Sequence, residues 1–141
     1  MLLQGSCLCQ AIVFQIRDVG DQIGHCHCSM CQKFHGAAFS TFVPVKLEHL
    51  TWLQGKELLS AYTADNGTVR QFCRQCGSSL TFQSATQGNE QSLEIALPAL
   101  DLTNVATQHI PQPNAHVYTK SKVPWYRILD SLPQYTQGRD T

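Results

Sequence analysis

The sequence is organised around the stretch Cys26-His27-Cys28-Ser29-Met30-Cys31, which brings three thiols close together in the chain. Two cysteine pairs flank it, Cys7-Leu8-Cys9 upstream and Cys73-Arg74-Gln75-Cys76 downstream. All seven cysteines of the chain belong to these three clusters. A single cysteine is most often an inert core residue, but that explanation does not account for seven cysteines at ligand spacing. The pattern therefore indicates metal binding.

Disulfide bonds explain the cysteines less well. Seven is an odd number, so complete pairing leaves one thiol over. The segment from Met1 to Gly5 lacks the charged start and the long apolar run of a secretory signal. This predicts a cytoplasmic protein, and thiols stay reduced in the cytoplasm.

Zinc prefers thiolate ligands in a tetrahedral arrangement, and Cys-x-x-Cys and Cys-x-Cys turns supply two ligands each. The two outer cysteine pairs would together supply all four ligands of one structural zinc site, leaving no open position. The middle cluster would leave a fourth position open, as catalytic zinc sites do. We therefore expect two zinc ions per chain, the second more easily lost. The expected ligands are Cys7, Cys9, Cys73 and Cys76 for the structural zinc, and Cys26, Cys28 and Cys31 for the catalytic zinc.

Other groupings stay open at this point. Cys26 and Cys28 could join an outer pair, or a nearby histidine could complete the middle site and make it structural. The candidates for that role are His25, His27 and His35. Adjacent strand residues face opposite sides, so a histidine beside a ligand is expected to point away. The histidines without a spacing signal, expected as ordinary surface or core residues, are His49, His109 and His116.

Length and charge narrow the class of protein. A chain of 141 residues fits one domain, predicted as residues 1–141. Charged residues make up 14% and the formal net charge is zero, with no basic stripe or charge block. This argues against nucleic acid or an anionic membrane as a partner. An apolar run of about 18 residues is also absent, so no transmembrane helix is expected.

Short alternating segments between turn residues predict an all-β domain. One helical turn is expected at 32–35, ended by Gly36, and Pro44 is expected to stop the strand before it. Asp65-Asn66-Gly67 is a hairpin turn signal. The segments 83–92 and 101–114 are predicted loops, and the tail 127–141 is predicted to fray. The predicted strands are 11–17, 22–26, 37–43, 51–54, 59–63, 68–72, 79–82, 93–97 and 116–118.

The three cysteine clusters, taken with their neighbours, resemble the glutathione-dependent formaldehyde-activating enzyme family, whose GFA domain is shared with centromere protein V. The resemblance spans about residues 3–135 and includes one departure, Gln10, where the family often has Gly. We expect a β-region turn that tolerates this residue. The segments that carry the resemblance are Gly5-Ser6-Cys7-Leu8-Cys9, the middle cluster, Gly36-Ala37-Ala38-Phe39, Phe72-Cys73-Arg74-Gln75-Cys76-Gly77-Ser78 and Ser121-Lys122-Val123-Pro124-Trp125-Tyr126.

The resemblance implies a β-tent of twisted antiparallel sheets and the same division of the cysteines into a structural and a catalytic zinc site. It also implies a carbon–sulfur lyase that joins glutathione to formaldehyde as S-hydroxymethylglutathione. A different small thiol or electrophile would suit the same site. The candidates for binding glutathione are three lysines and one aromatic wall, Lys33, Lys120, Lys122 and Trp125. The alternative functions are a non-catalytic zinc module that docks a partner and a thiol or metal sensor.

Overall fold

The computed structural model describes residues 1–85 and 91–141. They group into two compact units, one of residues 1–21 and 43–111 and the other of residues 22–42 and 112–141. The described residues form two β-sheets and one short α-helix, which confirms the predicted all-β class. The prediction of a single domain over 1–141 stays a prediction. No helix in the described part of the chain is both long and apolar enough to cross a membrane.

The first unit contains a small antiparallel sheet with the order β1-β2-β5. Its strands are β1 (Leu3–Ser6), β2 (Val13–Ile16) and β5 (Leu50–Gln54). Phe14 and Ile16 alternate on its buried face and are fully enclosed, which confirms the strand predicted from their pattern. The sequence analysis missed β1. Gly5 lies opposite Phe14 there, and a Cβ at Gly5 would stand 2.3 Å from the Phe14 ring.

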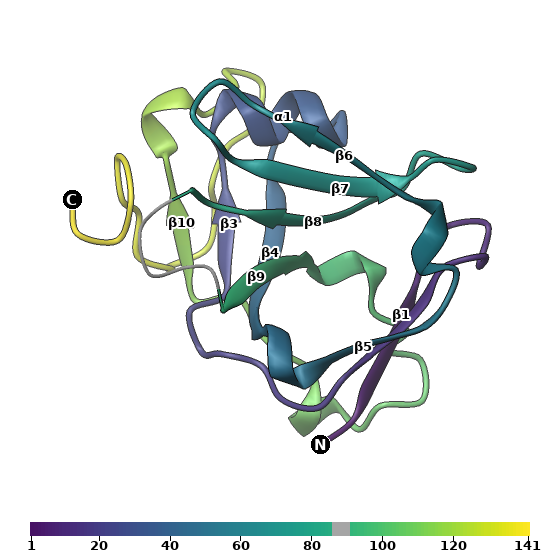
Figure 1. The fold of residues 1–141 in the computed structure, drawn as a ribbon. Helices are drawn as coiled ribbons and strands as arrows, with labels where there is room; N and C mark the ends of the chain where they lie inside the picture. The colour runs from purple at the N-terminus through teal and green to yellow at the C-terminus, as the bar shows by residue number, and fades with distance from the viewer. Residues whose placement is uncertain (86–90) are drawn as a thin grey trace. The chain divides into compact units, whose positions relative to one another are not determined.

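The same unit contains four strands that follow one another in space, in the order β9-β8-β7-β6 (Figure 1). They are β6 (Leu59–Thr63), β7 (Val69–Cys73), β8 (Ser79–Gln83) and β9 (Ser92–Ala96). The predicted hairpin turn joins β6 to β7. Gly67 adopts the left-handed φ of 86°, and the Thr68 N–H donates to Asn66 Oδ1 at 3.0 Å. Of the predicted loop 83–92, residues 86–90 lie outside the described residues.

The second unit is built on β3 (Gly24–Cys26), which pairs in parallel with β10 (Ala115–Val117) (Figure 1). Helix α1 (Ser29–His35) follows β3 and begins three residues earlier than predicted. Its start is explained by Cys28, whose Sγ accepts from the Cys31 N–H and so caps the first turn. Gly36 ends the helix at φ 59°, as predicted.

Strand β4 (Ser40–Lys46) corrects the prediction that Pro44 ends the strand. Its first residues pair with β3, and the strand then runs on through Pro44 into the first unit. Proline lacks an N–H, but its carbonyl can still accept. The Gly20 N–H donates to the Pro44 carbonyl at 2.8 Å, so only one donor is lost and the extended backbone continues.

The C-terminal tail is also ordered, against the prediction that it frays. It runs beside β10, where the His116 N–H donates to the Pro133 carbonyl and the Tyr135 N–H donates to the His116 carbonyl, both at 2.9 Å. The Tyr118 N–H donates to the Gln137 carbonyl at 2.9 Å. These main-chain bonds substitute for the apolar pattern that the tail lacks. Short 3₁₀ turns complete the fold at Leu47–His49, Lys56–Leu58, Leu97–Ala99, Thr107–His109 and Thr119–Ser121.

We predict that Gly55→Ala destabilises the first unit by about 3 kcal/mol or more. Gly55 adopts φ 74°, and its Cβ would lie 2.1 Å from the Ala11 carbonyl oxygen, a main-chain atom that cannot rotate away. Gly36→Ala is the control. Its φ of 59° is also left-handed, but the space around it is open, so only about 1 kcal/mol should be lost. Chemical denaturation measures both, and equal losses would contradict the steric argument.

Candidate metal centres

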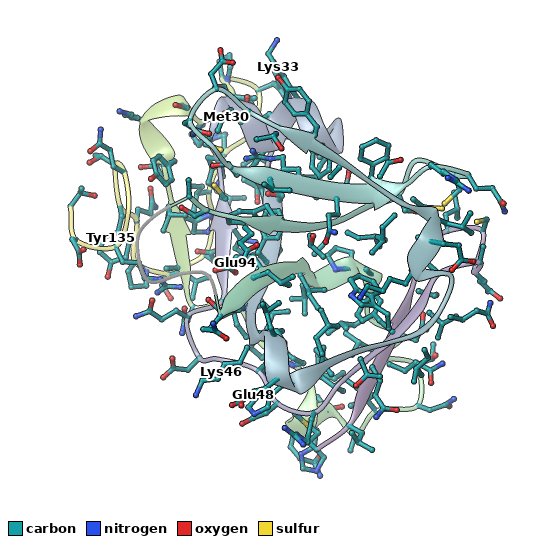
Figure 2. The ribbon with its side chains drawn as sticks, viewed as in Figure 1. Met30, Lys33, Lys46, Glu48, Glu94 and Tyr135 are labelled. Carbon is teal, nitrogen blue, oxygen red and sulfur yellow. The ribbon has the colours of Figure 1, made fainter. Side chains whose placement is uncertain are left out.

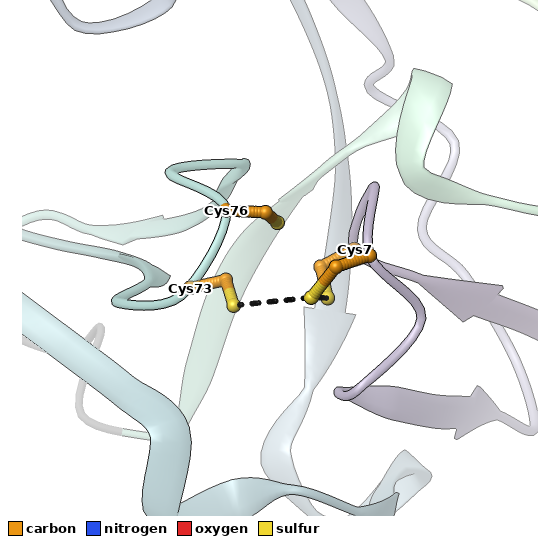
Figure 3. A group of neighbouring side chains, drawn as sticks. Cys7, Cys73 and Cys76 are labelled. Carbon is orange, nitrogen blue, oxygen red and sulfur yellow. Dashed lines mark hydrogen bonds between the residues drawn. The ribbon is translucent and has the colours of Figure 1, made fainter.

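The thiols of Cys7, Cys9, Cys73 and Cys76 come together in the first unit, with all four sulfur atoms within 4.8 Å of one another. Cys7 and Cys9 lie on the turn after β1, and Cys73 ends β7 at the start of the turn that carries Cys76. Figure 3 shows Cys7, Cys73 and Cys76 pointing toward a common centre. The Cys7 and Cys9 sulfurs are 3.6 Å apart, and the Cys9 and Cys73 sulfurs are 4.0 Å apart.

These sulfurs accept hydrogen bonds from the turns that carry them. The Ile12 N–H donates to Cys7 Sγ at 3.3 Å, and the Gln75 N–H donates to Cys73 Sγ at 3.4 Å. The Gln75 side-chain amide donates to Cys9 Sγ at 3.4 Å. Amide donors aimed at sulfur stabilise thiolates, so the turns are built for ligands that have lost their protons.

Two thiols of this cluster have pKa values shifted in opposite directions. Burial raises the pKa of Cys7 to about 11. Burial also acts to raise the pKa of Cys76, but hydrogen bonds from Ser78 and the Cys9 main chain outweigh it and bring that pKa down to about 5. Cys76 therefore loses its proton more readily than Cys7 does. A divalent cation would replace those protons, because metal binding requires deprotonated sulfur.

Gln10 occupies a left-handed conformation, with φ 64°. The expected β-region turn at this residue is therefore wrong. The Gln10 N–H donates to the Cys7 carbonyl at 3.0 Å, which closes a tight turn around the first two sulfurs. Glycine adopts this φ without strain, whereas other residues lose roughly 1–2 kcal/mol. The turn that carries Cys7 and Cys9 therefore forms despite this conformational cost at Gln10.

The second unit gathers the thiols of Cys26, Cys28 and Cys31, again with all sulfurs within 4.8 Å. Cys26 ends β3, and Cys31 lies in the first turn of α1. The Cys26 and Cys31 sulfurs are 3.6 Å apart, far beyond the S–S bond length of about 2 Å. All seven cysteines of the chain are free thiols. The two clusters are the groups that the sequence analysis expected.

Hydrogen bonds between neighbouring thiols, together with burial, dominate the electrostatics of the three-thiol cluster. Hydrogen bonds with the Cys28 and Cys31 thiols, followed by burial, raise the pKa of Cys26 well above its usual range. The pKa of Cys31 is also raised, since the Cys28 thiol and burial outweigh the opposing bond with Cys26. Three thiolates this close to one another require a cation. Thiolate donors favour zinc over hard cations such as magnesium, so both clusters fit zinc.

No histidine joins the three thiols within the part of the chain that the structure describes. His27, which lies between two of the ligands, turns its ring away and hydrogen-bonds His116. His25 likewise bonds Thr41, with 2.7 Å between Nδ1 and Oγ1. The alternative of a histidine-completed site is therefore not supported. Burial, followed by the charge of His116, lowers the pKa of both His25 and His27, the latter to about 4.

The proposed glutathione-binding side chains differ in their surroundings. Lys33 and Lys120 are exposed, and Lys33 extends outward from α1 (Figure 2). The Lys122 ammonium donates to the carbonyls of Val123 and Tyr126, so its hydrogen bonds go to the main chain. Trp125 is 78% exposed and offers an apolar face. Their role in binding a substrate stays a prediction.

Sequence reasoning missed His116 and Asp130. His116 is 1% exposed, and its ring bonds both His27 and the Asp130 carboxylate. No spacing signal could have found this contact, because His27 and His116 lie 89 positions apart in the chain.

We predict that Cys73→Ser removes one zinc per chain and lowers thermal stability strongly, because structural zinc contributes on the order of 10 kcal/mol to folding. Elemental analysis and thermal denaturation measure the two effects. Cys28→Ser is the matched variant, since it alters one thiol of the other cluster and should remove one zinc with less loss of stability. A Cys73→Ser protein that keeps two zinc ions would contradict the four-thiol assignment.

Comparison with known proteins agrees with this geometry. No curated protein is significantly similar in sequence. A crystal structure of a Rhodobacter sphaeroides protein from a structural genomics programme is similar in fold, with a TM-score of 0.59 and 21% identity. That match covers 78% of this chain and 96% of the other. Residues 2–121, which include every cysteine, match the family described as glutathione-dependent formaldehyde-activating enzyme. The chain therefore belongs to the glutathione-dependent formaldehyde-activating enzyme (GFA) family.

Proposed function

We propose that this protein is a zinc-dependent carbon–sulfur lyase that joins glutathione, or another small thiol, to formaldehyde or a related small electrophile. The family match supports the general chemistry. The observation that carries the proposal is the unequal size of the two thiol groups, four in one unit and three in the other. Four thiolates complete a tetrahedral zinc site, whereas three leave a position for a substrate.

The residues that would hold the catalytic zinc are Cys26, Cys28 and Cys31. When bound there, zinc supplies a positive charge that lowers the pKa of a thiol or water and polarises a carbonyl. In the net reaction the thiol sulfur forms a bond to the aldehyde carbon, the C=O double bond becomes a single bond, and the thiol proton ends on oxygen. Nothing is oxidised or reduced.

The chain's own residues hold the three sulfurs in place before any metal binds. Cys28 Sγ accepts from the Cys31 N–H at 3.2 Å, which fixes two sulfurs relative to the start of α1. The Gln32 side-chain amide donates to the carbonyls of His27 and Ser121, at 2.8 Å and 2.9 Å. These two hydrogen bonds tie the cysteine segment to the segment that leads to Lys122 and Trp125. A preorganised site loses less entropy when its ligand binds.

We expect zinc-loaded protein to accelerate formation of S-hydroxymethylglutathione from glutathione and ¹³C-formaldehyde, followed by NMR against the uncatalysed reaction. Cys31→Ser should lower the acceleration by roughly tenfold or more, because one of three ligands is lost. Met30→Leu is the matched control: Met30 lies beside Cys31 in the first turn of α1, is 39% exposed and is not a proposed ligand, so the activity of this variant should equal that of the wild type.

The competing functions predict other outcomes. Glutathione at 100 times its dissociation constant should stabilise a thiol-binding native state by about 2.7 kcal/mol, so thermal shift measures binding directly. A partner-docking module should show neither the shift nor the acceleration. A thiol or metal sensor should lose one zinc on mild oxidation without accelerating the reaction. Two zinc ions with no acceleration for glutathione or other small thiols would overturn the lyase proposal.

A further inference from the structure

A hydrogen-bonded series of three side chains, His27, His116 and Asp130, leads from the interior of the second unit to its surface and belongs to neither thiol cluster. His27 Nε2 lies 2.8 Å from His116 Nδ1. His116 Nε2 lies 3.0 Å and 3.2 Å from the two carboxylate oxygens of Asp130. Both histidines are buried, His27 at 0% and His116 at 1% exposure. Buried polar groups are costly unless they are paired, so the arrangement calls for an explanation.

The carboxylate decides the direction of both hydrogen bonds. A carboxylate can only accept, so His116 Nε2 carries a hydrogen and donates to Asp130. In a neutral ring the other nitrogen, Nδ1, is then an acceptor. When both rings are neutral, the hydrogen of the second bond comes from His27 Nε2. Asp130 therefore selects one tautomer of His116, and His116 selects one tautomer of His27.

The His27 ring depends on the hydrogen bond to His116 for its position. Its Nδ1 is buried and has no hydrogen-bond partner among the described residues, so the bond to His116 is the one that orients its ring. Its main chain is held as well. The His27 N–H donates to the Val117 carbonyl at 3.0 Å, and its carbonyl accepts from Gln32 at 2.8 Å. His27 is the residue between the ligands Cys26 and Cys28, so fixing it fixes the backbone that sets both sulfurs.

The hydrogen-bonded series of His27, His116 and Asp130 is not itself a metal site. Both nitrogens of His116 are used in hydrogen bonds. The described residues offer no group in which these histidines and Asp130 could share an ion. Aromatic rings enclose the histidines instead: the His27 and Phe39 centroids are 5.0 Å apart, and the His25 and His116 centroids are 4.9 Å apart. These packed rings therefore hold His27, and with it the segment that carries Cys26 and Cys28, in place.

We propose that Asp130 and His116 are positioning residues that act through His27 to hold the three-cysteine loop in its metal-binding conformation. This inference rests on the proposed zinc site at Cys26, Cys28 and Cys31. It does not depend on which thiol or electrophile reacts there. Its physical basis is preorganisation: a loop held in the bound conformation binds the ion more tightly than one that must first be ordered.

Asp130→Ala tests the inference, because the Asp130 side chain is 44% exposed and its loss opens no cavity in the buried core; the variant also loses the bond from the Leu132 N–H to Asp130 Oδ1. Wild type and variant, each loaded with zinc at both sites, are titrated with a chromophoric chelator of known affinity. We expect the three-cysteine site to lose about tenfold in zinc affinity. The four-cysteine site in the same molecule should be unchanged and serves as the internal control. Asp140→Ala, an exposed residue of the same tail, controls for the loss of one negative charge.

A spectroscopic readout separates positioning from a general loss of structure. Histidine ¹⁵N chemical shifts report which ring nitrogen carries the hydrogen, and we expect the Nε2–H form for both His27 and His116 in the wild type. In Asp130→Ala, His116 should become a mixture of tautomers while the dispersed amide spectrum is kept. Unchanged histidine chemical shifts in the variant would contradict the proposal that Asp130 sets the tautomers of His116 and His27.

The remaining outcomes separate this inference from the proposed function. Two zinc ions per wild-type chain, with equal affinities in wild type and Asp130→Ala, would overturn the positioning role and leave the lyase proposal standing. One zinc per wild-type chain, held by the four-cysteine site, would overturn both. A tenfold loss confined to the three-cysteine site, in a protein without lyase activity, would support the positioning role and overturn the lyase proposal.

Discussion

The close packing of cysteine sulfurs is the constraint on which the rest of this structure depends. At two places, cysteines from different elements bring their thiols within 4.8 Å of one another. Burial raises the pKa of Cys7, and hydrogen bonds with the neighbouring thiols raise the pKa of Cys26, so these two sulfurs hold their protons more tightly than an ordinary cysteine does. A soft divalent cation replaces protons on sulfur, so folding and metal binding are coupled in such clusters. The hydrogen bonds from Ile12 and Gln75 to sulfur are fully used only when the thiols are ionised.

The two clusters are supported in different ways, and the difference matches their proposed roles. Main-chain and amide donors surround the four-thiol cluster, on turns at the ends of β1 and β7. The three-thiol cluster has a helix start on one side and buried imidazoles behind it. Four ligands leave nothing for a substrate to occupy, whereas three ligands on a firmly held loop leave a position free without letting the remaining sulfurs drift.

The secondary structure shows where local patterns are sufficient. The alternation of Phe14 and Ile16 predicted β2, and Asp65-Asn66-Gly67 predicted the β6–β7 turn, because both signals act within a few residues. Pro44 misled the prediction of β4, since the lost donor is offset by a bond from Gly20 that lies far away in the chain. The tail was predicted to fray because it has no apolar pattern. Its order comes from main-chain bonds to β10, which no local pattern reveals.

The sequence by itself pointed to the seven cysteines and to the two groups that the structure gathers, because the spacing within a Cys-x-Cys or Cys-x-x-Cys turn is a local property of the chain. It also carried the family, through motifs that span most of its length. Only the tertiary structure decided that Gln10 adopts a left-handed turn, that no histidine among the described residues joins the three thiols, and that His116 joins His27 to Asp130. These features depend on segments separated by up to 89 positions. Their contact is fixed by strand pairing and burial, and spacing along the chain carries no information about either.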